Sequence, residues 1–257
     1  MIFNKRTNKI EKLLKGDRYV PGKFIDSYGN IFVYPDQQSF AWTYKELFEK
    51  QVYFFKTKKK DPYIIDCGAN IGVSIIYFKH LFPNSKILAF EPDPFLFDYL
   101  EKNIKMNNLK SVDLIKKAVW NQESIIEFFQ EKSDSGRIDL NNSFDIINSN
   151  KIKVESTLLS QYIQERVDFL KIDIEGAEYP VLLEIKNKLS LIDRLFIESH
   201  SFKGDKQDLH KILKLLYNKN FRYYLTEGAV TTDNPFLKVK SYLNMDMQTN
   251  IHAINNN

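Results

Sequence analysis

The sequence predicts an α/β fold in which a mostly parallel sheet of seven strands has helices on both faces. From residue 61 onward, short apolar runs alternate with helical stretches of about 10–15 residues, which is typical of strands joined by helical crossovers. A glycine-containing turn follows the first of these runs. With 43% hydrophobic and 27% charged residues among 257, the composition is that of a globular protein.

The first part of the chain differs from this alternation in its high content of aromatic side chains. Residues 1–16 predict a short amphipathic helix, residues 24–34 two short strands around a Gly-Asn turn, and residues 42–50 another helix. We therefore divide the chain into a small α+β cap, residues 1–60, and a main domain, residues 61–257.

The main domain follows as strands and helices in turn. Strands are expected at 63–65, 86–90, 112–115, 167–172, 195–197, 223–225 and 250–254. Helices are expected at 71–81, 94–107, 178–189 and 206–219. Because a helix separates most of these strands, the majority of the strands are expected to run parallel.

After the third strand the alternation is interrupted. Residues 125–129 predict an inserted hairpin strand, and the polar stretch 131–150 predicts a loop that lies over the site. Residues 152–155 predict a short edge strand and residues 156–165 a helix.

Charge and cysteine content narrow the classes of function. The 37 Lys and Arg residues exceed the 33 Asp and Glu residues by only 4, and the basic residues are scattered, so a nucleic-acid binder is not favoured. A single cysteine, Cys67, excludes an intrachain disulfide and a Cys-rich zinc site. No stretch reaches the ~18–20 apolar residues of a membrane span, and the first residues lack the pattern of a secretory signal. We therefore expect a cytoplasmic protein.

The strongest local pattern is the turn Asp66–Gly72, directly after the first strand. Glycine lets the backbone turn tightly and lets a ligand approach it, and the helix that follows offers free N–H groups. Glu91 ends the second strand, where a carboxylate accepts hydrogen bonds from ribose hydroxyls. Together these features predict a ligand that contains adenosine.

The glycine spacing separates two classes of adenosine cofactor. Nicotinamide dinucleotides are bound by Gly-x-Gly-x-x-Gly, whereas here the glycines are Gly68 and Gly72. Asp66 would repel a pyrophosphate but suits S-adenosylmethionine, which carries a sulfonium and an α-amino group. A nicotinamide-dependent oxidoreductase remains the less favoured alternative.

Three stretches of the chain resemble the FkbM family of S-adenosylmethionine-dependent methyltransferases. They are Ile64–Gly72, Phe90–Pro92 and Asp168–Glu178, in that order, and Phe196–His200 extends the likeness. The resemblance covers roughly residues 50–200. It implies a Rossmann-like class I methyltransferase fold and, usually, O-methylation of sugars, glycans or related metabolites.

The resemblance also implies which residues hold the cofactor. In the loop they are Asp66, Gly68, Ala69, Asn70 and Gly72. Glu91 matches the ribose acid, with Pro92 beside it, and Ala118 follows the third strand, where its backbone would meet adenine. Tyr53 precedes the first strand and either closes over the cofactor or packs in the core.

Four acidic residues and one histidine are the candidates for catalysis and substrate binding. Asp173 ends the fourth strand, and Glu198 and His200 leave the fifth strand two residues apart, so they share a face. A sugar hydroxyl needs a base to remove its proton, and these three residues are the catalytic candidates. Glu175 and Glu178 are expected to bind substrate, although Glu178 could instead complement the helix dipole.

The predicted function is S-adenosylmethionine-dependent O-methylation of a carbohydrate, a glycan or a nucleotide-activated sugar. The net positive charge is compatible with an anionic acceptor. The catalytic candidates could instead hold Mg²⁺, which prefers oxygen ligands, but we favour a metal-free reaction and assign no metal ligand. Methylation of RNA or protein is the second hypothesis in the same class, and a non-catalytic binding module is a third.

Overall fold

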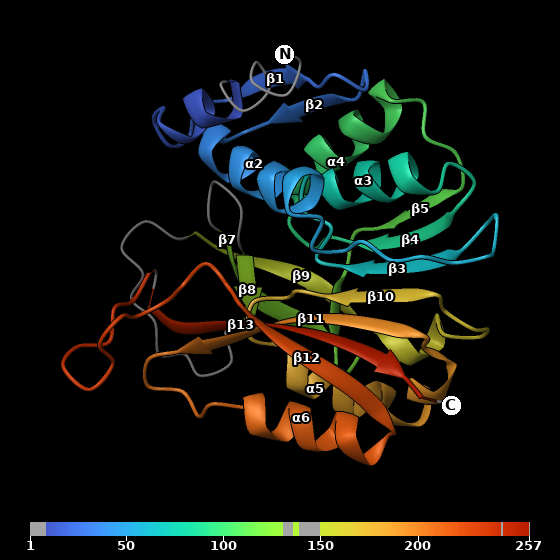
Figure 1. Cartoon of the computed structure of the whole chain (residues 1–257), viewed down its shortest axis with the longest axis vertical. Helices are drawn as coiled ribbons and strands as arrows, with labels where there is room; N and C mark the ends of the chain where they lie inside the picture. The colour runs from blue at the N-terminus through green and yellow to red at the C-terminus, as the bar shows by residue number, and fades with distance from the viewer. Residues whose placement is uncertain (1–8, 131–135, 139–149, 243, 257) are drawn as a thin grey trace.

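The computed structural model describes residues 9–130, 136–138, 150–242 and 244–256. A seven-stranded sheet forms its centre, in the order β12-β13-β11-β10-β3-β4-β5 (Figure 1). The strands are β3 (Tyr63–Cys67), β4 (Lys86–Phe90), β5 (Val112–Ile115), β10 (Phe169–Ile172), β11 (Arg194–Phe202), β12 (Phe221–Glu227) and β13 (Met245–Asn255). Strands β5, β4, β3, β10 and β11 run parallel, and β13 is antiparallel to both of its neighbours. The predicted α/β fold with a mostly parallel sheet is confirmed.

Helices cover both faces of this sheet (Figure 1). Helices α3 (Val73–Leu81) and α4 (Pro94–Met106) lie on one face, and α5 (Glu178–Glu184) and α6 (Leu209–Asn218) lie on the other. Alternation along β3 explains the two layers, because Ile64 packs in the core under α3 and Ile65 in the core under α5. The parallel strands consequently end at one edge, from which the helices begin.

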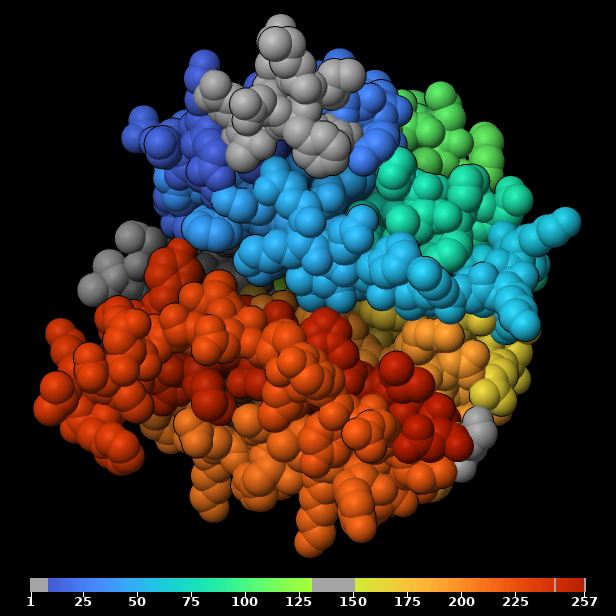
Figure 2. Space-filling view, in the orientation of Figure 1, coloured from blue at the N-terminus to red at the C-terminus, as the bar shows by residue number. Residues whose placement is uncertain are grey.

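The N-terminal segment packs on the α3 and α4 side (Figures 1 and 2). After a helical turn at 9–14, strands β1 (Gly22–Ile25) and β2 (Ile31–Tyr34) form the predicted hairpin. Helix α2 (Gln37–Tyr44) continues into a π-helical turn, η1 (Lys45–Glu49). The helix expected at 42–50 therefore begins earlier, because Asp36 accepts a hydrogen bond from the Gln38 N–H and caps it.

Aromatic contacts join this segment to the main domain. Phe48 stacks on Tyr44 with ring centroids 4.6 Å apart and meets the Tyr77 ring of α3 at 5.3 Å. The Asn103 side chain of α4 accepts a hydrogen bond from the Val33 N–H at 2.7 Å and donates one to the Val33 carbonyl at 2.9 Å. One hydrophobic core thus spans the predicted boundary at residue 60.

The insertion after β5 is a second sheet in the order β6-β9-β7-β8. Its strands are β6 (Ala118–Trp120), β7 (Ile125–Gln130), β8 (Gly136–Ile138) and β9 (Asn150–Leu158). The short edge strand expected at 152–155 is wrong, because β9 is longer and pairs on both sides, with β6 and with β7. Of the loop expected at 131–150, Gly136–Ile138 is a strand, and residues 131–135 and 139–149 lie outside the described residues.

Of the expected helices, one is absent and another is shorter than predicted. The helix expected at 156–165 is absent, because residues 156–158 belong to β9 and only the 3₁₀ turn η2 (Leu159–Gln161) follows. Helix α5 ends at Glu184 and gives way to the 3₁₀ turns η3 (Ile185–Asn187) and η4 (Leu189–Leu191). In contrast, β11 extends beyond the expected 195–197 because β13 pairs along its whole length.

Candidate active site

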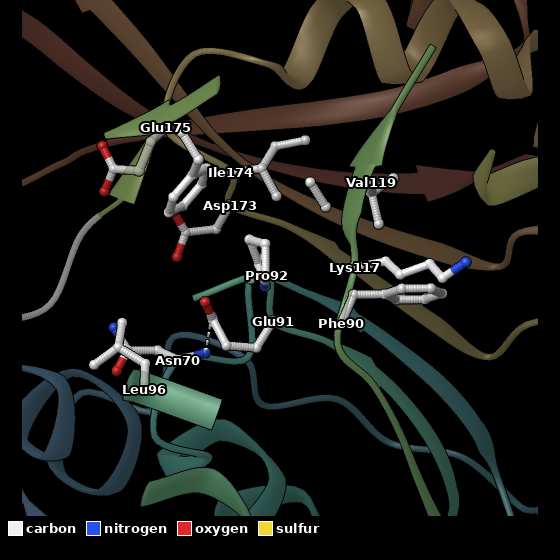
Figure 3. Close-up of a pocket in the computed structure, with 13 residues that line it drawn as sticks. Asn70, Phe90, Glu91, Pro92, Leu96, Lys117, Val119, Asp173, Ile174 and Glu175 are labelled. Carbon is white, nitrogen blue, oxygen red and sulfur yellow. Dashed lines mark hydrogen bonds between the residues drawn. The ribbon is translucent and has the colours of Figure 1, made fainter. Parts of the chain in front are cut away.

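A pocket opens at the edge where the parallel strands end (Figure 3). Its lining comes from the loop after β3, the end of β4, the start of α4, β6, β7 and the loop after β10. The lining residues are Gly68, Asn70, Phe90, Glu91, Pro92, Leu96, Lys117, Ala118, Val119, Phe128, Asp173, Ile174 and Glu175. Polar side chains and backbone from the strand ends converge in this pocket beside apolar side chains, as in small-molecule sites.

The turn after β3 is built so that the backbone lies against the loop after β10. Gly68 has φ of 85°, and a Cβ atom placed there would lie 1.9 Å from the Asp173 carbonyl oxygen. The N–H groups of Gly68 and Ala69 donate to the Phe90 carbonyl at 3.0 and 2.9 Å. Gly72, with φ of 83°, then begins α3. Glycine at position 68 is therefore a steric requirement of the pocket wall.

Glu91 directs its carboxylate into the pocket from the end of β4 (Figure 3). It accepts hydrogen bonds from the N–H groups of Asn70 at 2.8 Å and Asp93 at 2.9 Å. Burial nevertheless raises the pKa of Glu91 to about 7. A carboxylate held at a strand end beside apolar walls fits the ribose and adenine of an adenosine ligand.

Not all of the predicted cofactor residues reach the pocket surface. Asp66 is fully buried, accepts a hydrogen bond from the Ser74 hydroxyl and lies 3.3 Å from the Lys171 ammonium. Ala69 and Gly72 shape the turn from behind the lining. Tyr53 packs in the aromatic core, with its ring centroid 4.6 Å from that of Phe196.

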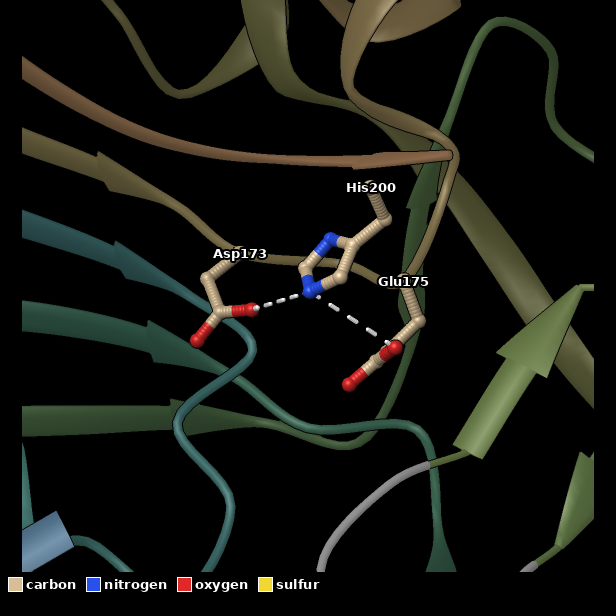
Figure 4. Close-up of side chains that lie close together, drawn as sticks. All are labelled: Asp173, Glu175 and His200. Carbon is tan, nitrogen blue, oxygen red and sulfur yellow. Dashed lines mark ion pairs between the residues drawn. The ribbon is translucent and has the colours of Figure 1, made fainter. Parts of the chain in front are cut away.

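Asp173 and Glu175 enter the pocket, and His200 lies behind them (Figure 4). The buried His200 ring has Nδ1 at 2.8 Å from a Glu178 oxygen, and its Nε2 lies 3.7 Å from Glu175 and 3.9 Å from Asp173. Burial lowers the pKa of His200, but the Glu175 and Glu178 carboxylates outweigh it and hold the pKa well above its usual range. The imidazole is therefore protonated in this arrangement.

Glu198 lies on the same face of β11 as His200, and both contact the Gln248 side chain of β13. Gln248 donates a hydrogen bond to Glu198. Burial, and then the Asp173 carboxylate, raise the pKa of Glu198 well above its usual range. These effects favour the protonated form of Glu198, which is half-buried and is not among the described residues that line the pocket.

Glu178 has partners within the protein rather than in the pocket. Its Oε1 accepts hydrogen bonds from the N–H groups of Gly176 at 3.0 Å and Ile174 at 3.4 Å, in addition to the His200 contact. The residue is only 2% exposed. Through these hydrogen bonds, the Glu178 carboxylate holds the loop between β10 and α5 against His200.

Several lining residues were not anticipated from the sequence. They are Phe90, Leu96, Lys117, Val119, Phe128 and Ile174. Most of them lie next to predicted motif residues in the sequence, and this closeness is the signal that could have identified them. Phe128 is different, because it reaches the pocket from the inserted sheet, and no local pattern connects it to Gly68.

Asp173, Glu175 and His200 have ligand atoms within 4.8 Å of one another, a set that could hold a metal ion by residue type (Figure 4). A metal would have to displace the proton from His200, since metals bind the neutral ring. The arrangement is also complete without a metal, because the protonated ring already balances part of the carboxylate charge.

The family model of the Methyltransferase FkbM domain matches residues 66–223, a range that contains the glycine turn, Glu91 and the Asp173 loop. The chain belongs to the FkbM methyltransferase family. Methyltransferase 1 of Beauveria bassiana is 28% identical over 184 residues, covering 63% of this chain and 74% of that protein. Methyltransferase sdnD of Sordaria araneosa is 27% identical over 206 residues, covering 66% and 79%.

A more distant relative is the 2-O-methyltransferase NoeI of Sinorhizobium fredii, 25% identical over 158 residues, 55% of this chain and 64% of that protein. Among solved structures, an FkbM methyltransferase from Methylobacillus flagellatus superposes with a TM-score of 0.54 at 14% identity. That match covers 96% of this chain, which spans 59% of the solved chain. At this identity the likeness shows the fold.

FkbM membership decides between the two cofactor classes predicted from the sequence. The protein is an S-adenosylmethionine-dependent methyltransferase, and the comparisons give no support for Mg²⁺. In the part of the chain that the structure describes, no helix combines the length and apolar character needed to cross a bilayer.

Proposed function

We propose that this FkbM methyltransferase transfers a methyl group to a hydroxyl oxygen of a carbohydrate acceptor. The observation that carries the proposal is that Glu91 and Asp173 line one pocket from the ends of β4 and β10. One carboxylate suits the ribose of the cofactor, and the other is free to face an acceptor hydroxyl. The 2-O-methyltransferase NoeI supports oxygen as the methylated atom.

The pocket residues divide into two groups in this proposal. Glu91 accepts the ribose hydroxyls, while Ala118, Val119 and Phe128 form apolar walls for adenine. Asn70 and Gly68 present backbone to the ligand, and Asp66 contributes negative charge from beneath the turn. When bound, S-adenosylmethionine supplies an electrophilic methyl group attached to a positively charged sulfur.

Asp173 is the base we propose for the acceptor hydroxyl. It lines the pocket with its side chain 25% exposed, whereas His200 is buried and Glu198 is half-buried, and neither is among the described lining residues. The pKa values of His200 and Glu198 are both raised, which favours their protonated forms, so we do not propose either as the base. We assign His200, whose Nε2 lies 3.9 Å from Asp173 and 3.7 Å from Glu175, the role of stabilising the charge of these carboxylates as the acceptor binds. General-base catalysis of this kind contributes roughly 10²–10⁴-fold in rate.

The charge of the pocket favours an uncharged hydroxyl over a phosphorylated acceptor. Among the described residues, Glu91, Asp173 and Glu175 line it, and the ammonium group of Lys117, which also lines it, lies 3.0 Å from Glu155. A phosphate or an RNA backbone would meet mostly carboxylates. The anionic acceptor that the net charge of the chain allowed is therefore not part of this proposal.

The test combines cofactor binding with a product search. The protein, incubated with S-adenosylmethionine and a panel of uncharged glycans, should yield a product about 14 Da heavier by mass spectrometry, whereas phosphorylated sugar nucleotides in the same panel should not be methylated. Asp173→Asn should lower kcat by about 10²–10⁴-fold and leave the Kd for S-adenosylhomocysteine within about threefold. An Asp173→Asn enzyme that retains wild-type kcat would remove Asp173 from the mechanism.

A further inference from the structure

Lys171 is a buried cation at the centre of the site that the mechanism above does not use. It lies on β10, and its side chain is only 4% exposed. Its Nζ donates a hydrogen bond to the Gly68 carbonyl at 2.7 Å and lies 3.2 Å from Asp173 Oδ2 and 3.3 Å from Asp66 Oδ1. One ammonium group therefore contacts the glycine turn and the proposed base together.

The strand register explains this position. Lys171 is the direct neighbour of Asp66 on the parallel pair β10 and β3, so their side chains leave the sheet close together near its carboxyl edge. A buried ammonium requires opposite charge and hydrogen-bond acceptors. Asp66, Asp173 and the Gly68 carbonyl supply them. Burial lowers the pKa of Lys171, but the Asp173 and Asp66 carboxylates outweigh burial and raise this pKa. The ammonium group therefore keeps its charge.

The contacts have consequences on both sides of the pocket. The hydrogen bond from Lys171 holds the Gly68 carbonyl and thereby fixes the turn. The next residues of the turn, Ala69 and Asn70, reach the end of β4, where the Asn70 N–H donates a hydrogen bond to Glu91. Lys171 contacts Oδ2 of Asp173, so the other carboxylate oxygen, Oδ1, is the one that lies near His200. Neither role requires Lys171 to touch a ligand, and it does not line the pocket.

We propose that Lys171 is a positioning residue that couples the cofactor turn to the catalytic carboxylate, through simultaneous contacts with the Gly68 carbonyl and Asp173. The inference rests on the proposed function, because it takes the pocket as the cofactor site and Asp173 as the base. Loss of the charge is expected to weaken cofactor binding and to make Asp173 easier to protonate. A purely structural ion pair would affect only the stability of the fold.

The structure offers a matched control at the opposite end of the same strands. Lys59 lies 2.9 Å from Asp168 Oδ2, and Asp168 is 1% exposed. Asp168 immediately precedes β10, and its side chain also accepts a hydrogen bond from the Tyr63 N–H of β3. Lys59→Met removes a partly exposed Lys–Asp pair between the segment that precedes β3 and the residue that precedes β10, and Lys59 does not line the pocket. Comparison with Lys171→Met separates loss of an ion pair from loss of positioning.

The experiment measures S-adenosylhomocysteine binding by calorimetry and the titration of the Asp173 carboxyl carbon by ¹³C NMR. Lys171→Met should weaken binding about tenfold or more and raise the pH midpoint of the Asp173 signal. Lys59→Met should leave both within experimental error of wild type, and Lys171→Arg should recover part of the affinity. Lys171→Gln keeps a hydrogen-bond donor for Gly68 but has no charge. It should show the raised Asp173 midpoint and a smaller loss of affinity than Lys171→Met. It also serves as the neutral variant if Lys171→Met does not fold.

The outcomes separate the two proposals. Wild-type protein that binds no S-adenosylhomocysteine overturns the proposed function, and the role of Lys171 with it. Wild-type binding with unchanged affinity and an unchanged Asp173 midpoint in both neutral Lys171 variants overturns the positioning role alone. Equal losses in Lys59→Met and Lys171→Met would likewise show that Lys171 is only a structural ion pair.

Discussion

Glu91 shows how one buried side chain prepares this site for its ligand. Two backbone N–H groups point at its carboxylate, yet burial dominates and raises the pKa to about 7. Without a ligand the group is therefore only partly ionised near neutral pH. Ribose hydroxyls donate hydrogen bonds, so they favour the ionised form of the carboxyl.

Cofactor binding should consequently depend on pH through Glu91. The ionised fraction grows as pH rises through about 7, so the affinity for S-adenosylhomocysteine should increase across this range and level off above it. Calorimetry between about pH 5.5 and pH 8.5 measures the effect. Glu91→Gln should bind more weakly at high pH and lose this dependence. If that variant keeps the wild-type pH profile, another group is titrating.

At the scale of the element, the site depends on how α4 is joined to the inserted sheet. The Asp93 side chain caps α4 by accepting a hydrogen bond from the Phe95 N–H at 2.8 Å, and the same oxygen accepts one from the Gln130 amide of β7 at 2.7 Å. Strand β7 also carries Phe128 to the pocket. One fully buried carboxylate thus fixes a helix end and the strand that forms a pocket wall.

Asp93→Ala should affect both stability and binding. Loss of a helix cap costs about 0.5–2 kcal/mol, and loss of the Gln130 contact frees the end of β7. We expect a lower denaturant midpoint and weaker S-adenosylhomocysteine binding. Gln130→Ala, which removes the strand contact but keeps the cap, should reduce binding with a smaller change in stability. Unchanged affinity in both variants would mean that pairing with β8 and β9 is sufficient to hold β7 in place.

At the scale of the whole molecule, the N-terminal segment and the α3 face form one hydrophobic core. Phe32 and Phe40 are buried in the same cluster as Ile75 and Phe78 of α3. In Figure 2 the N-terminal segment shares the upper half of the view with the residues of α3 and α4, while the C-terminal part of the chain occupies the lower half. Burial of apolar side chains in this one core therefore stabilises both the cap, residues 1–60, and the main domain, residues 61–257.

Phe32→Ala should accordingly destabilise the entire protein. Truncation of a buried phenylalanine costs about 3–5 kcal/mol. Calorimetric heating should show one transition at a lower Tm than wild type, because the cap and the main domain unfold together. Phe54→Ala, at a position that is 46% exposed, is the control and should change Tm little. Two separate transitions would show that residues 1–60 are an independent unit.

The sequence predicted the parts of the fold that depend on local pattern. Apolar runs and helical periodicity located all seven core strands, and the motifs around Gly68 and Glu91 identified two walls of the pocket. Longer-range pairing caused the failures. Strand β9 is extended by partners on both sides, and β11 by β13, and neither effect is visible in a window of ten residues.

What the sequence determined by itself is the order of the core elements, the adenosine cofactor class and most of the residues near its pocket, because each depends on short-range pattern. Only the tertiary structure decided which carboxylates face the pocket and which are buried behind it. It placed Glu178 and Glu198 in contacts with other side chains, surrounded His200 with carboxylates that raise its pKa, and set Lys171 between two strand ends. The physical reason is that burial and charge compensation depend on neighbours from other strands, which the linear sequence does not bring together.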